Sequence, residues 1–251
     1  MPPMGSVLVF SILGASSLAT SFISGILGMA GGMILMGVLL ALLSLPAAMM
    51  LHGISQLAAN GWRALMLRRE IDWRVMGGYV AGAALSLAFF LWLRLVVAKP
   101  VALIAMGLTP FIALVLPERL HLNVERPWHP FACGVVCLTF NLTAGIAGPL
   151  LDIFFVRSKM TRQVVVATKA ATQALSHVVK VAYFGGVIAL GTDEITPALA
   201  ATMVILAFVG TTLSRQVLDR LSDASFRQWT RWTVMSLGLA YLASGLHLAA
   251  S

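Results

Sequence analysis

The sequence alternates between long apolar stretches and short polar or charged ones. A helix needs about 20 apolar residues to cross the hydrocarbon core of a bilayer, and most of these stretches have about that length. Charged residues and prolines gather between them, so each stretch is predicted to be a membrane helix or a pair of helices. The eight stretches are 6–43, 47–67, 73–95, 98–116, 130–156, 161–184, 197–214 and 228–249. The pattern therefore predicts an all-α, polytopic integral membrane protein.

Glycine interrupts the two longest stretches. The first contains Gly25, Gly28, Gly31 and Gly32, and the second contains Gly145 followed by Gly148 and Pro149. Irregular backbone at membrane depth is tolerated only where protein or a water-filled cavity satisfies its polar groups. Matched interruptions in two halves are typical of transporter binding sites, whereas close helix packing on glycine is the alternative. We expect glycine-broken or re-entrant helices, with Gly28 and Gly148 at a binding site.

Polar residues repeat between the two halves of the chain. Each residue of a second set stands 117 positions after its counterpart in a first set. The first set is His52, Gln56, Asn60 and Arg63, and the second is Lys169, Gln173, His177 and Lys180. The spacing keeps each set within about 80° of arc on an ideal helix, as a stripe about 16 Å long. We expect two repeated halves of four hydrophobic segments each, at 1–116 and 130–251, joined by a linker at 117–129.

The chemistry of the two stripes suits a small oxyanion. Lysine and arginine supply positive charge, and glutamine and asparagine supply amide N–H groups. Helix N-termini at the glycine breaks would add backbone donors and a positive dipole end. Polar residues inside a membrane usually face a cavity or a partner, and we expect all eight stripe residues to bind substrate. The alternative is that Arg63 snorkels to the interface and that His52 and Asn60 connect neighbouring helices.

Asp152 is an isolated acid in the apolar run after the second glycine break. It is predicted either to pair with a lysine, with Lys180 the suggested partner, or to carry a proton that drives transport. Structural pairing is the more common outcome for such a residue.

Composition narrows the class of protein. The 251 residues are 59% hydrophobic and only 10% charged, whereas soluble domains carry about 25% charged residues. The net charge of +8 is explained by basic loops that face the anionic cytoplasmic leaflet, so nucleic acid is not an expected partner. Two cysteines form neither a disulfide framework nor a structural zinc site, and we expect no metal and no cofactor.

Lys and Arg in short loops set the orientation of a membrane protein. The richest segments are 63–74, 157–162 and 215–231. The first two can share the cytoplasmic side only if 130–156 is a re-entrant hairpin. The same arrangement at 6–43 makes the halves inverted repeats. Eight simple spans with parallel halves is the alternative.

Several motifs resemble the sulfite exporter TauE/SafE family. They are Gly25-x-x-Gly28-x-x-Gly31-Gly32, the Arg-Glu-Ile-Asp-Trp run at 69–73, the Gly-Pro-Leu-Leu-Asp-Ile-Phe-Phe run at 148–155, and the polar helix at 166–185. The likeness covers nearly the whole chain. It implies a multi-pass protein of the bacterial inner membrane that exports sulfite or an organosulfonate.

These observations together predict a secondary transporter that exports a small sulfur oxyanion, such as sulfite or sulfoacetate. No Walker A motif and no nucleophile–base signature is present in the sequence, so the chain is expected not to be an enzyme. A membrane assembly or receptor subunit is the alternative function. The expected partners are a small inorganic or organosulfur anion and membrane lipid, and a homodimer is left open.

Overall fold

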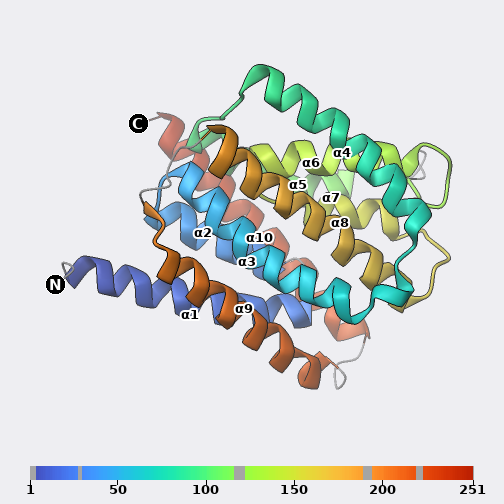
Figure 1. Ribbon diagram of the computed structural model, residues 1–251, viewed down its shortest axis with the longest axis horizontal. Helices are drawn as coiled ribbons and strands as arrows, with labels where there is room; N and C mark the ends of the chain where they lie inside the picture. Colours follow the sequence, from blue (N-terminus) through green and yellow to red (C-terminus); the bar gives the residue numbers. More distant parts are fainter. Residues whose placement is uncertain (1–3, 28–29, 116–121, 189–193, 219–222, 251) are drawn as a thin grey trace.

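The computed structural model describes residues 4–27, 30–115, 122–188, 194–218 and 223–250 (Figure 1). Every regular element within these ranges is a helix. In chain order they are α1 (Met4–Leu27), α2 (Ala30–Leu42), α3 (Leu45–Met66), η1 (Arg68–Glu70), α4 (Trp73–Leu93), α5 (Lys99–Val115), α6 (His129–Thr143), α7 (Gly148–Phe155), α8 (Arg162–Ala182), the π-helical turn η3 (Tyr183–Ile188), α9 (Pro197–Leu218) and α10 (Asp223–Ala250). The all-α prediction is confirmed.

The polar residues between the apolar stretches start the helices. Ser44 accepts a hydrogen bond from the backbone N–H of Ala47 (3.5 Å) at the start of α3. Asp72 accepts from the N–H groups of Arg74 and Val75 (2.9 and 3.1 Å) at the start of α4. Such caps satisfy N–H groups that have no partner within the helix.

Each of the two longest apolar stretches forms a pair of helices. Helix α1 ends at Leu27 and α2 begins at Ala30, so Gly31 and Gly32 are helical and the expected irregular backbone does not extend to them. Gly28 lies outside the described residues. In the second pair, α6 ends at Thr143 and α7 begins at Gly148, and Gly145 between them has a φ of +77°.

Helices α6 and α7 form a hairpin whose two ends lie together. The N–H of Val124, before α6, donates to the carbonyl of Phe154 at the end of α7 (3.0 Å). The Asn123 side chain also donates to the carbonyl of Arg157 (3.1 Å). Helix α7 therefore returns to the end of the molecule at which α6 began. Figure 1 shows α1 and α2 folding back on each other in the same manner.

The helices pack in four main pairs. Helix α1 lies on α9, α4 on α6, α3 on α8 and α5 on α10. The first two pairs are parallel, because residue numbers rise together along both helices of each pair. In the α4–α6 pair, for example, Gly82 lies against Phe131, and further along both helices Ser86 bonds Thr139. In the α3–α8 and α5–α10 pairs the contacts run in opposite directions, so these pairs are antiparallel.

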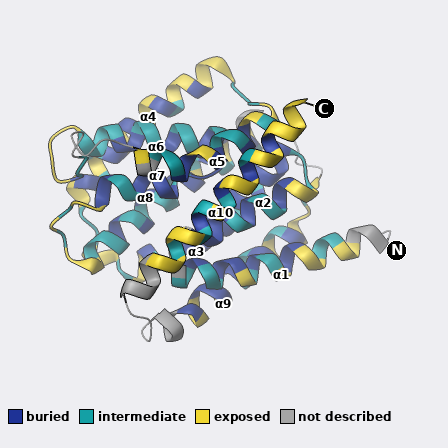
Figure 2. Ribbon diagram, turned by 180° about the vertical axis from the view of Figure 1, so that it is seen from behind, coloured by how far each residue is buried: buried dark blue, intermediate teal, exposed yellow. Residues whose placement is uncertain are grey.

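Apolar side chains cover the outside of the molecule. Among the described residues, four helical segments are long and apolar enough to cross a membrane: Val7–Ile26, Trp73–Leu93, Pro197–Ser214 and Gln228–Ala250. Exposed positions concentrate on α4 and α10 (Figure 2), and they include Phe89, Trp92 and Leu239. A face of this kind suits contact with lipid acyl chains.

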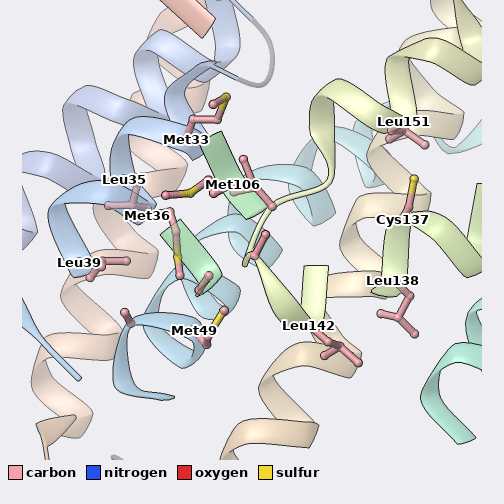
Figure 3. Packing of buried hydrophobic residues seen from close by; sticks show 14 of the residues in the cluster. Met33, Leu35, Met36, Leu39, Met49, Met106, Cys137, Leu138, Leu142 and Leu151 are labelled. Atoms are coloured by element: carbon pink, nitrogen blue, oxygen red, sulfur yellow. The ribbon is translucent and has the colours of Figure 1, made fainter. Parts of the chain in front are cut away.

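Methionines fill the core between the two hairpins. Met33, Met36, Met49 and Met106 are at most 1% exposed and lie in one cluster with Leu142 (Figure 3). Unbranched methionine fills irregular spaces, and Met36 and Met49 lie close to Gly145 in the turn between α6 and α7.

Candidate functional site

A cavity of about 570 Å³ lies between α3, α8 and the two helix hairpins. Seven of the nine candidate residues that the structure describes line it. They are His52, Gln56, Arg63, Gly148, Lys169, Gln173 and His177. The two stripes thus face one shared space, while Asn60 and Lys180 lie behind the cavity wall.

The charge of the cavity wall is positive. Arg63, Lys169 and Arg162 line the cavity, and no Asp or Glu does so among the described residues. An anion in a low-dielectric site needs compensating charge, because an uncompensated buried charge costs several kcal/mol. The wall supplies that compensation.

Three side chains of the cavity wall have buried nitrogen atoms without a hydrogen-bond partner. These atoms are Gln56 Nε2, Arg63 Nη2 and His177 Nδ1. An unsatisfied buried polar group costs about 1–3 kcal/mol. The amide nitrogen of Gln56 and the guanidinium nitrogen of Arg63 can only donate, so they favour a ligand that carries acceptors, and His177 Nδ1 does the same when it carries the ring proton. An oxyanion is such a ligand, because it carries several acceptor oxygens and no positive charge.

Asn60 orients two of these side chains from behind the wall. Its amide donates to Gln56 Oε1 (3.4 Å), and its Oδ1 accepts from Arg63 Nη1 (3.3 Å). Both contacts follow the i, i+3 and i, i+4 spacing of one helix face. The same spacing that identified Asn60 in the sequence makes it a support for its neighbours.

Asp152 forms an ion pair with Lys169. The suggested pairing with Lys180 is therefore wrong. The hairpin explains the difference, because α7 returns toward the first turns of α8, where Lys169 lies, and not toward its last turn. Asp152 itself is not part of the cavity wall, so Lys169 presents a partly neutralised charge to the cavity.

Lys180 is fully buried at the inner end of the α8 stripe. Its ammonium donates to the Gly145 carbonyl (2.9 Å) and to His52 Nδ1 (2.8 Å). His52 in turn donates from Nε2 to the Gly32 carbonyl (2.9 Å). In this arrangement the Lys180 ammonium contacts protein groups behind the wall and not the cavity.

Both helices that follow the breaks present their first residues to the cavity. Gly32 and Met33 near the start of α2, and Gly148 and Pro149 at the start of α7, belong to the wall. N–H groups and the positive end of the helix dipole favour an anion at such places.

Arg162 and Asn141 are among the wall residues that the sequence analysis did not single out. Arg162 lies at the exposed end of the cavity, and Asn141 is 1% exposed and donates to the Ser176 carbonyl (2.9 Å). Arg162 stands seven residues before Lys169, so extending the α8 stripe by two turns would have found it. Asn141 is a buried amide in an apolar stretch, and a polar residue at such a place is itself a signal of a site.

The described residues define an α-helical membrane protein with a cation-lined cavity between two broken helices. The family model "Sulfite exporter TauE/SafE" matches residues 13–241, and the chain belongs to this family. The resemblance noted in the sequence is thus confirmed, and the chain is a transmembrane protein of a transporter family. Comparison with curated proteins gives no match, and comparison with solved structures gives none either.

Proposed function

We propose that the protein is a secondary transporter that exports a small sulfur oxyanion, sulfite or an organosulfonate such as sulfoacetate, across the bacterial inner membrane. The observation that carries the proposal is the donor-rich cavity wall, where Gln56, Arg63 and His177 hold unpartnered nitrogen atoms and no acid is present among the described wall residues. Family membership supports the direction and the sulfur chemistry.

The two halves of the chain act in this proposal as inverted repeats, at 1–116 and 130–251 with a linker at 117–129. Exchanging the halves turns the α1–α9 pair into the α6–α4 pair, and both pairs are present and parallel. The same exchange maps the α3–α8 pair onto itself and the α5–α10 pair onto itself, and both of these pairs are antiparallel. A two-fold axis in the membrane plane accounts for all four relations.

The orientation follows from the basic segments. Arg68 and Arg69, in η1 directly after α3, lie near the first turns of α8, where the Asp72 N–H donates to Thr168 Oγ1 (2.9 Å). The segment 157–162 lies at this same end of the molecule. The positive-inside rule places it in the cytoplasm, so the cavity, which reaches the exposed Arg162, opens toward the cytoplasm.

Export of an anion from this side needs no nucleotide. A negative charge that leaves a cell with a negative interior gains about 2.3 kcal/mol per 100 mV of membrane potential. The positive cavity wall would load the anion at low cost and release it on the far side.

Two measurements on the purified protein test this function. Sulfite and sulfoacetate are expected to raise its melting temperature in detergent, whereas chloride at equal ionic strength is not. Proteoliposomes are then expected to show flux of the stabilising anion that responds to an imposed membrane potential. Stabilisation without flux would favour the receptor or assembly subunit, and absence of both would refute an anion site.

A further inference from the structure

Lys180 connects the two glycine-broken hairpins. Its ammonium bonds the carbonyl of Gly145 in the turn between α6 and α7, and through His52 it is connected to the Gly32 carbonyl of α2. Residues next to both contacts, Ile146 and Met33, belong to the cavity wall. One buried cation thus holds together parts of the wall that come from opposite halves of the chain.

This connection lies at the closed end of the cavity. Along α8, Arg162 is exposed, Lys169 is 25% exposed, His177 is 7% exposed and Lys180 is fully buried. At this depth α3 and α8 are in close contact, since a Cβ added to Gly53 would lie 2.7 Å from Val181 Cγ2. The cavity therefore ends at Lys180.

The Lys180 ammonium has no carboxylate partner among the described residues. It relies on one carbonyl and one imidazole, which do not neutralise its charge, and an uncompensated buried charge is costly. Water at this level would stabilise the ammonium, so an opened conformation is within energetic reach. The same contacts would have to break before an anion could pass between α3 and α8.

We propose that the bonds among Lys180, His52, Gly145 and Gly32 form the far gate of the exporter, and that Lys180 is a positioning residue and not an anion ligand. The inference rests on the proposed transport function. The His177 ring, on the cavity wall, lies edge-on to His52 with ring centroids 5.5 Å apart. An anion that reorients His177 would thereby disturb the gate.

Cysteine labelling in detergent tests the gate without any anion. In a background with Cys133→Ala and Cys137→Ala, Met50→Cys reports on the far side of the gate, where a Cβ added to Gly185 would lie 3.0 Å from Met50 Cε. Val166→Cys reports on the cavity itself. Lys180→Met is expected to speed maleimide labelling of the Met50→Cys reporter by about tenfold or more, within the usual range of conformational coupling, and to leave the Val166→Cys reporter unchanged.

Two further variants keep the test decisive. Lys169→Met removes the other lysine of the α8 stripe and is expected not to speed labelling at the far side. His52→Phe removes the bonds of His52 to Lys180 and to the Gly32 carbonyl but leaves the bond between Lys180 and Gly145. It is also expected to speed labelling at the far side, and it serves if Lys180→Met does not fold.

Three outcomes separate the alternatives. Unchanged far-side labelling in both gate variants would overturn the gate, and lost sulfite stabilisation in Lys180→Met would then make Lys180 a ligand. Equal acceleration in Lys169→Met would also overturn it, as general loosening. Faster labelling in the gate variants of a protein that no oxyanion stabilises would support the gate and refute the proposed substrate.

Discussion

Nitrogen atoms without partners are the feature of single residues that bears most directly on the substrate. These atoms are Gln56 Nε2, Arg63 Nη2 and His177 Nδ1. They belong to facing helices, and their residues line one cavity. Folding alone gains nothing from leaving them unpaired, since each costs about 1–3 kcal/mol. A ligand that supplies acceptors to all three would recover that free energy on binding.

Arg63 is the wall residue that has both a positive charge and a buried nitrogen atom without a hydrogen-bond partner. Hydrogen bonds to charged groups contribute about 1.5–3 kcal/mol, so Arg63→Met is expected to raise the Kd for the stabilising anion by about 10- to 100-fold. Titration of the melting temperature with anion measures this change. Arg68→Met removes the same charge outside the cavity and should leave the Kd unchanged; equal losses in both variants would indicate a non-specific charge effect.

Gly145 is required by the turn between α6 and α7. Its φ is +77°, and an added Cβ would lie 2.6 Å from Met36 Cε and 3.0 Å from Met49 Sδ. Left-handed backbone and overpacking together predict that Gly145→Ala destabilises the protein by about 2–4 kcal/mol. Thermal unfolding in detergent measures the loss. At Gly77 an added Cβ meets nothing within 4 Å, so Gly77→Ala serves as the control, and equal melting temperatures for the two variants would contradict the strain argument.

Helices α3 and α8 show how far the sequence predicts the elements. Polar residues at i, i+4, i+8 and i+11 predicted two helices with one polar face each, and six of these eight residues do line one cavity. The predicted apolar stretches also contain the main part of every described α-helix, because lipid and core both require apolar surface, whereas the short helix η1 lies outside them.

Contacts set by long-range packing could not be predicted in this way. The partner of Asp152 depends on where α7 ends after the turn, and the sequence does not specify that direction. Lys180 shares the α8 stripe with His177, yet the Gly145 carbonyl holds its ammonium behind the wall. A stripe defines a helix face, whereas the neighbouring backbone decides which side chains on that face reach the cavity.

The pairing of α7 with α8 leads to a prediction about Asp152. The carboxylate and Lys169 are 38% and 25% exposed, so their ion pair contributes at most about 1 kcal/mol. Asp152→Asn would free Lys169 for the anion and is expected to tighten anion binding by up to about fivefold. Glu70→Gln makes the same charge change away from the cavity and should have no effect. Unchanged affinity, with loss of the pH dependence of flux in proteoliposomes, would instead make Asp152 the proton-coupling group.

At the scale of the whole molecule, basic residues are more numerous at one end than at the other, where Lys99 donates to the Leu43 carbonyl (3.3 Å). Arg68, Arg69, Arg74 and the segment 157–162 lie at the end where the cavity is exposed. Glu194 lies at the other end, where its carboxylate accepts from the Ser44 N–H (3.0 Å) before α3. Charge asymmetry of this kind orients short loops across a membrane, and it is independent of the chemistry inside the cavity.

The orientation of the protein in the membrane can be measured independently of the chemistry in the cavity. In the cysteine-free background, Val166→Cys lies on the cavity wall and Ala198→Cys lies exposed at the opposite end, in the first turn of α9. A membrane-impermeant maleimide is expected to label the Val166→Cys reporter in inside-out vesicles and the Ala198→Cys reporter in intact cells, because the positive-inside rule places the basic end in the cytoplasm. Bound sulfoacetate, which unlike sulfite does not add to the maleimide, should slow labelling at Val166→Cys alone, since it occupies the cavity. Labelling of Val166→Cys from the outside of intact cells, with Ala198→Cys protected there, would reverse the orientation and with it the side from which the anion is loaded.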